Sequence, residues 1–563
     1  MSADGLTGTN ENELVFLPLG GCEEIGMNVN AYGYGPANNR RWIIADLGVT
    51  FGSLETPGVD IITADISYLD GEQIDAIFLT HAHEDHIGAA GLLWPRLRAP
   101  MYATPFTAEL VRHKLLEHGI DEEQHLNVIP QGSTISVGPF TVKYVTLTHS
   151  IPEPNALAIK TPAGMLLHTG DWKIDPDPLV GDQMDEETLS TLGDEGVLAM
   201  ICDSTNVFEE GEAGSEATVR DALIKLVGEQ TGRVAVTTFA SNVARVESVI
   251  RAAEANGRHV CLVGRSMHRV TTAAKAVGML DDVQPFIDEE EAGYLPSDAV
   301  LYLCTGSQGE PRAALGRIAR DQHRNVVLGA DDVVIFSSRV IPGNEKGIFE
   351  MMNALADKGV RLITPKMVED PIHVSGHPCR DELRRMYQWV RPKIAVPVHG
   401  ERRHTLEHAA YAKSLQIPHA VTPKNGDMVR LAPGQAHIVD TVPAGKMYLD
   451  GNVLVPEGSI GMAERQKLSW FGVVFVTLAI DDDLKLADGP IVVARGFSEP
   501  DGSAADESLV LLEDAAELAF DRMKRRGRED DDIVERDVGR ATRKACEQIF
   551  GRKPVIDVTV LRV

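Results

Sequence analysis

The sequence has little cysteine, and no two cysteines stand in a C-x-x-C arrangement. Six cysteines, Cys22, Cys202, Cys261, Cys304, Cys379 and Cys546, are scattered over 563 residues. Such scattering indicates buried thiols in a reducing compartment and excludes a disulfide framework or a cysteine-type zinc site.

The chain also lacks a segment for secretion or membrane insertion. No basic stretch followed by an apolar stretch opens it. The longest apolar run, near residues 470–480, is too short to span a bilayer and contains β-branched residues typical of a strand. These features predict a cytoplasmic protein without a membrane partner.

Positive charge is scarce: 54 Lys and Arg stand against 83 Asp and Glu, which gives a net charge of −29. This balance disfavours a general nucleic-acid binder, because phosphate contacts need local Lys and Arg. It does not exclude an enzyme with a narrow basic channel, and a metal-dependent nuclease brings its own cations. The length predicts about three or four domains, and the 43% hydrophobic content supplies core material.

One short stretch, residues 80–88 (THAHEDHIG), concentrates three histidines and two carboxylates between an apolar strand at 74–79 and a helix beginning near 87. His81 and His83 are two residues apart, so they point the same way in an extended segment. Asp85 and His86 turn back at the helix start. Zinc favours imidazole with one or two carboxylates. The stretch predicts a catalytic zinc site rather than a histidine-rich surface turn.

Further candidate ligands follow strands. A strand at 140–148 ends at His149, and a hairpin at 156–160 and 165–168 precedes Asp171. Asp46 ends a strand at 42–48 and is either a turn former or an acceptor that fixes the tautomer of a metal-bound histidine. We expect His168 to be structural.

The order of these residues resembles the metallo-β-lactamase signature, which implies an αββα sandwich with metals at its loop end. Residues 215–371 alternate helices with short strands at 233–238, 260–263, 299–304 and 332–336, typical of an inserted α/β unit with a parallel sheet. This insert, Asp203 after a strand, the segment 373–377 (HVSGH) and His399 resemble the β-CASP branch, and most of all the bacterial ribonuclease J family.

The expected fold is therefore α/β, with an inserted β-CASP domain and a C-terminal α+β domain. We expect a metallo-β-lactamase domain at 1–214 and 373–432, the insert at 215–372, a Gly- and Pro-rich linker at 433–456 and the last domain at 457–563. In that last domain, strands are expected at 470–480, 490–495 and 555–561, and helices at 504–525 and 531–550. Its basic runs at 524–526 and 540–544 are more typical of solvated helix faces than of RNA contacts.

The resemblance implies specific roles. His81, His83 and His149 bind one Zn²⁺; Asp85, His86 and His399 bind a second; Asp171 bridges them. His377, Asp85 and Asp203 are the expected catalytic residues. Substrate binding is expected at Ser241, Asn242 and Val243 and along the segment His373, Val374, Ser375, Gly376 and His377.

Three functions compete. The first is a dizinc ribonuclease with 5′-to-3′ exonuclease and endonuclease activity on single-stranded RNA with a 5′ monophosphate, acting in messenger decay and ribosomal RNA maturation. It would form homodimers or homotetramers and join an RNA-degradation complex. The second is a small-molecule hydrolase, a lactonase or thioesterase, against which the insert and the 373–377 loop argue. The third, an inactive RNA-binding scaffold, ranks last because all seven expected ligands are present.

Overall fold

The computed structural model describes residues 11–53, 55–341, 343–498 and 506–563. They divide into two units, one made of the described residues within 11–50 and 63–446 and one made of those within 51–62 and 447–563. Each is described by itself.

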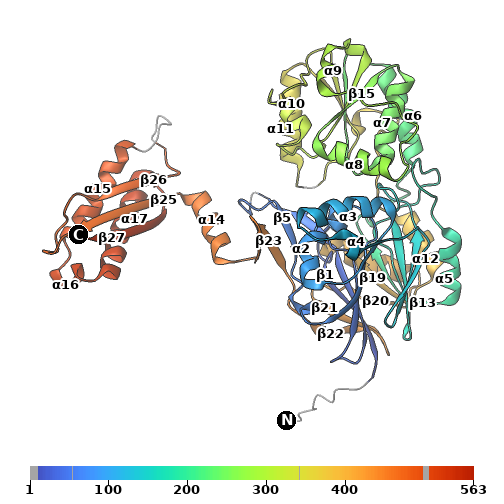
Figure 1. Ribbon diagram of the computed structural model, residues 1–563, viewed down its shortest axis with the longest axis horizontal. Coiled ribbons are helices and arrows are strands. Elements are labelled where there is room, and N and C mark those ends of the chain that lie inside the picture. The colour runs from blue at the N-terminus through green and yellow to red at the C-terminus, as the bar shows by residue number, and fades with distance from the viewer. Residues whose placement is uncertain (1–10, 54, 342, 499–505) are drawn as a thin grey trace. The chain divides into compact units, whose positions relative to one another are not determined.

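Two mixed sheets form the base of the first unit (Figure 1). The order of one is β22-β21-β1-β2-β3-β6-β7-β8, and the order of the other is β20-β19-β13-β12-β11-β10-β9. Side chains from both sheets share one core, in which Phe16 and Phe78 of the first sheet join Tyr144 and Leu166 of the second. Helices α5 (Glu186–Glu195), α12 (Arg380–Val390) and α13 (Arg402–Ser414) pack on the other face of the second sheet. The predicted αββα sandwich is confirmed.

The strands of the first sheet are β1 (Glu13–Gly20), β2 (Val29–Gly35), β3 (Arg41–Ala45), β6 (Gln73–Phe78), β7 (Met101–Ala103), β8 (Leu126–Val128), β21 (Asp427–Ala432) and β22 (His437–Thr441). Those of the second are β9 (Thr134–Val137), β10 (Phe140–Thr146), β11 (Asn155–Thr161), β12 (Gly164–His168), β13 (Val197–Asp203), β19 (Ile394–Val398) and β20 (His419–Ala420). Strands β12, β13 and β19 run parallel, so their carboxyl ends meet at one edge.

The insert contains a wholly parallel sheet of order β15-β16-β14-β17-β18, as expected for an α/β unit. Its strands are β14 (Val234–Thr237), β15 (His259–Val263), β16 (Val300–Cys304), β17 (Val333–Phe336) and β18 (Arg361–Ile363). Its longer helices are α6 (Glu216–Gly228), α7 (Val243–Ala255), α8 (Arg265–Ala276) and α11 (Glu345–Asp357). Because β13 and β19 are hydrogen-bonded neighbours, the chain leaves the sandwich and returns to it on adjacent strands.

The second unit has a three-stranded sheet of order β26-β25-β27, made of β25 (Val473–Ile480), β26 (Ile491–Arg495) and β27 (Val555–Arg562). Helices α15 (Asp506–Asp521) and α17 (Asp531–Phe550) bury their apolar residues against one face of it. No helix among the described residues has the length and apolar character needed to cross a membrane.

Two expectations need correction. Trp470 and Phe471, expected at the start of a strand, end helix α14 (Ile460–Phe471), and β25 begins at Val473. Gly472, with φ of 73°, supplies the left-handed residue that stops the helix. The stretch 433–456, expected to be an irregular linker, contains β22, β23 (Lys446–Asp450) and β24 (Val453–Pro456). The last two form an antiparallel hairpin around Gly451, so the stretch is not without regular structure.

Candidate metal centre

The candidate ligands follow the carboxyl ends of strands from both sheets. His81 and His83 lie between β6 and the short helix α1 (Glu84–Ile87). His149, Asp171 and His399 follow β10, β12 and β19. Strand ends place short loops side by side, so residues far apart in the sequence converge there.

These residues form two clusters. His81, His83, His149 and Asp171 offer ligand atoms within 4.8 Å of one another, and so do Asp85, His86, Asp171 and His399. Asp171 belongs to both. Its Oδ2 lies 3.3 Å from His86 Nε2 and 3.5 Å from His399 Nε2, and 3.9 and 3.8 Å from Nε2 of His81 and His149. One oxygen is thus within reach of both groups.

The chemistry of this donor set fits metal ions. His83 Nδ1 lies 3.1 Å from Nε2 of both His81 and His149, so three ring nitrogens face a common point. Asp171 Oδ1 is buried and has no hydrogen-bond partner among the residues that the structure describes. Convergent lone pairs and an unpaired buried carboxylate oxygen are costly unless a cation joins them.

The far ring nitrogens of four histidines are held by other groups. His86 Nδ1 contacts Asp46 Oδ2 at 2.7 Å, His81 Nδ1 contacts Thr80 Oγ1 at 3.0 Å, and His399 Nδ1 contacts Asn28 Oδ1 at 3.1 Å. His149 Nδ1 contacts the carbonyl oxygen of Gly376. Such partners fix ring orientation and tautomer in metal sites. Asp46 therefore takes the acceptor position that its place after a strand suggested.

Burial favours the neutral form of three imidazole rings in the first cluster, those of His81, His83 and His149. It holds the pKa of His81 and of His149 well below the ordinary range and lowers that of His83 to about 4. A neutral imidazole is the form that coordinates a cation. The backbone is also unusual here, because His399 and Asp46 have φ of 50° and 68°, a region that non-glycine residues rarely occupy. Strained residues of this kind concentrate at functional sites.

Asp203 and His377 form a pair beside the clusters. Asp203 Oδ2 lies 2.7 Å from His377 Nδ1, and the carboxyl group is buried. Burial lowers the pKa of His377, but the carboxylates of Asp203, Asp171 and Asp85 together outweigh burial and raise that pKa to about 9. The imidazole is therefore protonated at neutral pH.

The 373–377 loop is fixed by its neighbours. Asn206 Nδ2 donates to Ser375 Oγ at 2.7 Å and to the carbonyl oxygen of His377 at 3.0 Å. Gly376 approaches the metal cluster so closely that a Cβ there would lie 2.8 Å from His149 Cε1. Only glycine fits this position without moving a ligand.

The other expected substrate residues are less directly placed. Asn242 caps α7 by accepting from the amide of Arg245, and the side chain of Val243 is fully buried. Val374 is buried too, and burial lowers the pKa of His373 to about 3. Ser241 precedes the cap. Only Ser375, Gly376 and His377 of the expected set have contacts that tie them to the centre.

Two buried polar networks near the site were not expected from the sequence. Arg245 pairs with Glu216 at 2.9 Å and donates to carbonyl oxygens of Ser337 and Ile372. In the sequence, Arg245 and Glu216 look like ordinary charged residues on the exposed side of a helix.

The second network joins Ser204 Oγ to His408 Nδ1 and His408 Nε2 to Tyr387, both at 2.9 Å. It lies behind Asp203. The only sequence signal for it was a histidine on the apolar face of α13.

Models of four protein families match successive stretches of the chain. A model described as "Beta-lactamase superfamily domain" matches residues 57–192, and "Ribonuclease J, beta-CASP domain" matches 231–355. "Zn-dependent metallo-hydrolase RNA specificity domain" matches 365–423, and "Ribonuclease J C-terminal domain" matches 460–563.

Curated relatives agree along the full length. Ribonuclease J of Sinorhizobium meliloti is 47% identical over 98% of both chains. Ribonuclease J of Mycolicibacterium smegmatis is 38% identical over 97% of this chain and 96% of the relative. A crystal structure of a protein of unknown function from Enterococcus faecalis V583 covers 74% of this chain and 100% of its own, with a TM-score of 0.52 and 18% identity, and so shares the fold. The chain belongs to the ribonuclease J family and is a nuclease of the metallo-β-lactamase fold.

Proposed function

We propose that this protein is a dizinc ribonuclease that degrades RNA from a 5′-monophosphate end and also cleaves internally, in messenger decay and ribosomal RNA maturation in the cytoplasm. The observation that carries the proposal is the sharing of Asp171 by two ligand clusters directly beside the Asp203–His377 pair. Both relatives described above are named ribonucleases, which supports RNA as the substrate.

The ligand roles follow the two clusters, with His81, His83 and His149 on one zinc, Asp85, His86 and His399 on the other, and Asp171 between them. Two bound zinc ions would activate a water molecule and stabilise charge on the scissile phosphate. Asp203 orients His377, whose Nδ1 faces the carboxylate, so that Nε2 can give a proton to the leaving oxygen. Asp85, which is partly exposed beside His86, would also help to hold the attacking water.

The 5′ end is bound by the 373–377 loop. Ser375 Oγ, the Gly376 amide and Ser241 would hold a terminal phosphate, with Asn206 fixing Ser375 in place. A triphosphate is larger and more charged, and a hydroxyl end leaves these donors unpaired. Losing one such charged contact costs about 1.5–3 kcal/mol, which corresponds to roughly ten- to a hundredfold in rate.

The test is product analysis on one RNA, labelled at either end and prepared with a 5′ monophosphate, triphosphate or hydroxyl. We expect stepwise mononucleotide release from the monophosphate and internal products from all three. Ser375→Trp should abolish the monophosphate preference yet spare internal cleavage, whereas the exposed control Ser136→Trp should behave as wild type. Equal rates on all three ends would reject the exonuclease assignment. Comparable turnover of simple lactones or thioesters would support a small-molecule hydrolase instead.

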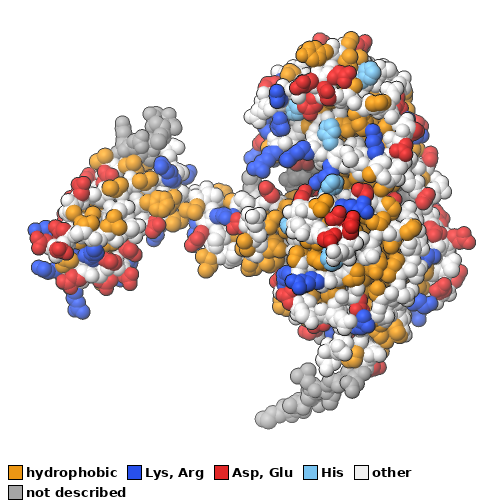
Figure 2. Space-filling view, viewed as in Figure 1, with side chains coloured by type: hydrophobic (Ala, Val, Ile, Leu, Met, Phe, Trp, Pro, Cys, Tyr) orange, Lys and Arg blue, Asp and Glu red, His pale blue; other side chains and the backbone are white. Residues whose placement is uncertain are grey.

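Self-association is proposed for the C-terminal unit. The domain boundaries are also a proposal: 1–214, 215–372, 373–432, 433–456 and 457–563. Apolar side chains gather on the surface of this unit (Figure 2). Among them, Trp470 is 74% exposed, Ile491 64% and Phe475 43%. Exposed apolar groups this large favour burial against another chain. A homodimer or homotetramer, and recruitment into an RNA-degradation complex, agree with that surface.

A further inference from the structure

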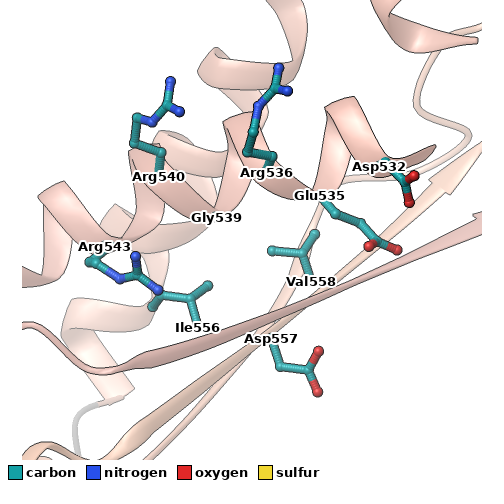
Figure 3. Close-up of a pocket in the computed structure, with 9 residues that line it drawn as sticks. All are labelled: Asp532, Glu535, Arg536, Gly539, Arg540, Arg543, Ile556, Asp557 and Val558. Carbon is teal, nitrogen blue, oxygen red and sulfur yellow. The ribbon is translucent and has the colours of Figure 1, made fainter. Parts of the chain in front are cut away.

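The second unit has a groove that the proposed nuclease chemistry does not use. It lies between α17 and strand β27 and encloses about 480 Å³ (Figure 3). Arg536, Arg540 and Arg543 of α17 line one wall, and residues 556–558 of β27 line the other.

Strand β27 is an edge of its sheet. Among the described residues it pairs with β25 alone. The amides of Val555 and Val563 donate toward β25, to the carbonyl oxygens of Gly472 and Ile480 at 3.1 and 3.0 Å. Because orientation alternates along a strand, the amides and carbonyl groups of residues 556, 558 and 560 point to the open edge. An unpaired edge of this kind is a template for another strand.

The arginines follow one side of α17 at positions i, i+4 and i+7, which share a helix face. Arg536 and Arg540 are 58% and 75% exposed, and both lie near the surface residue Asp537, at 3.0 and 3.7 Å. Arg543 forms no ion pair with any residue that the structure describes. Three exposed guanidinium groups beside one groove are notable in a chain of net charge −29, because most of its surface repels anions.

The spacing of the two walls fits an extended chain. Four helical residues separate Arg536 from Arg540 by about 6 Å along the axis. Alternate residues of a strand, which share one face, are about 6.8 Å apart. Carboxylates two positions apart on an added strand would therefore meet Arg536 and Arg540 and form charge-assisted hydrogen bonds.

The groove also discriminates between anions. Three carboxylates, those of Asp532, Glu535 and Asp557, also line the groove, away from Arg543 (Figure 3). RNA carries a phosphate on every nucleotide and would pass these carboxylates at a cost, whereas a peptide can change its charge from one residue to the next. Gly539 lies between the two ends, and a Cβ there would reach Val558 Cγ2 at 3.3 Å, so a larger side chain would fill the groove.

We propose that this groove binds an extended acidic segment of a partner protein, which adds to the sheet as a strand beside β27. The edge supplies main-chain hydrogen bonds, and the arginines select carboxylates at alternate positions. The acidic end of the groove favours a basic residue at the end of the segment that lies there.

The test uses the full chain and a fluorescein-labelled peptide, Thr-Glu-Val-Glu-Val-Glu-Val-Lys. Fluorescence anisotropy should show binding that weakens at least tenfold when Arg536, Arg540 and Arg543 are all replaced by Glu. A control with the same charge change, Arg525→Glu, Arg526→Glu and Lys544→Glu, alters exposed residues outside the groove and should bind as wild type. Both variants should keep wild-type RNA cleavage.

Hydrogen exchange resolved to single amides supplies the second readout. The peptide should slow exchange at residues 556, 558 and 560 more than at 557 and 559, which already pair with β25. Equal binding by the two triple variants would overturn the proposal. So would peptide binding without protection of β27, or tighter binding of an eight-nucleotide RNA in the same groove. Loss of self-association in the groove variant without any peptide binding would assign the surface to a second copy instead.

Discussion

At the scale of single residues, Asp171 is the position that the two candidate ligand clusters share, so the proposed dizinc centre predicts the largest effect there. Its Oδ2 faces histidines of both clusters, whereas His83 belongs to one. Asp171→Asn should therefore impair binding of both zinc ions and reduce RNA cleavage by at least a thousandfold, while His83→Ala should lose one ion. Metal content by mass spectrometry and far-UV circular dichroism check this. An Asp171→Asn protein that retains two zinc ions would exclude a bridging role.

His408 predicts a pH dependence of stability. Burial lowers its pKa to about 4, whereas an unfolded histidine titrates near pH 6.5. A group with a depressed folded pKa stabilises the fold above its unfolded pKa, and this contribution is lost as the pH falls from about 6.5 to 4. The full difference is about 3 kcal/mol.

The measurement is urea unfolding of wild type and His408→Gln at pH 7.5 and 5.0, both with zinc removed. Glutamine keeps hydrogen bonding with Ser204 but does not titrate. The wild type should lose more stability than the variant over this interval. Equal losses of stability in the wild type and the variant would show that titration of His408 does not contribute to the pH dependence.

At the scale of elements, Arg245 connects two helices of the insert with the residue that precedes the loop carrying His377. Arg245 of α7 contacts Glu216 of α6, the end of β17 and Ile372, which immediately precedes that loop. Arg245→Met leaves the buried Glu216 carboxylate without the cation it pairs with, which costs about 3–5 kcal/mol.

The double variant Arg245→Met with Glu216→Leu removes both charges and should regain a large part of this stability. Thermal unfolding of the two single variants and the double variant gives the coupling energy. Strictly additive losses would mean that the pair does not act as a unit.

Many of the helices and strands, and part of the candidate site, could be predicted from the sequence. The strand before His81, the parallel sheet of the insert and helix 531–550 were predicted, because apolar periodicity and turn residues are local signals. The seven expected ligands converge as the motif suggested. Arg245 with Glu216 and Ser204 with His408 were not foreseen, because their pairing depends on tertiary packing. Trp470 and Phe471 were placed in a strand because they resemble the residues after them, although Gly472 marked the boundary.

At the scale of the whole molecule, the exposed sheet face of the second unit predicts self-association. Phe475 and Ile491 lie on neighbouring strands of this face. Phe475→Glu with Ile491→Glu should lower the mass measured by light scattering, because two buried carboxylates oppose assembly. Val510→Glu with Leu511→Glu, at two exposed positions on α15, is the matched control. An unchanged mass in the double variant would place the contact elsewhere.

The position of the insert in the sequence also determines the order in which the candidate metal ligands are synthesised. The cluster of three histidines is complete once Asp171 has been made, but the second cluster waits for His399, which follows the entire insert. At about 5–20 residues per second, translation of that interval takes roughly ten to fifty seconds. Throughout it the nascent chain holds half of a metal centre and an unfinished sheet edge at β13, where β19 must still pair. A polypeptide that ends inside the insert lacks His399 and therefore one member of the second cluster.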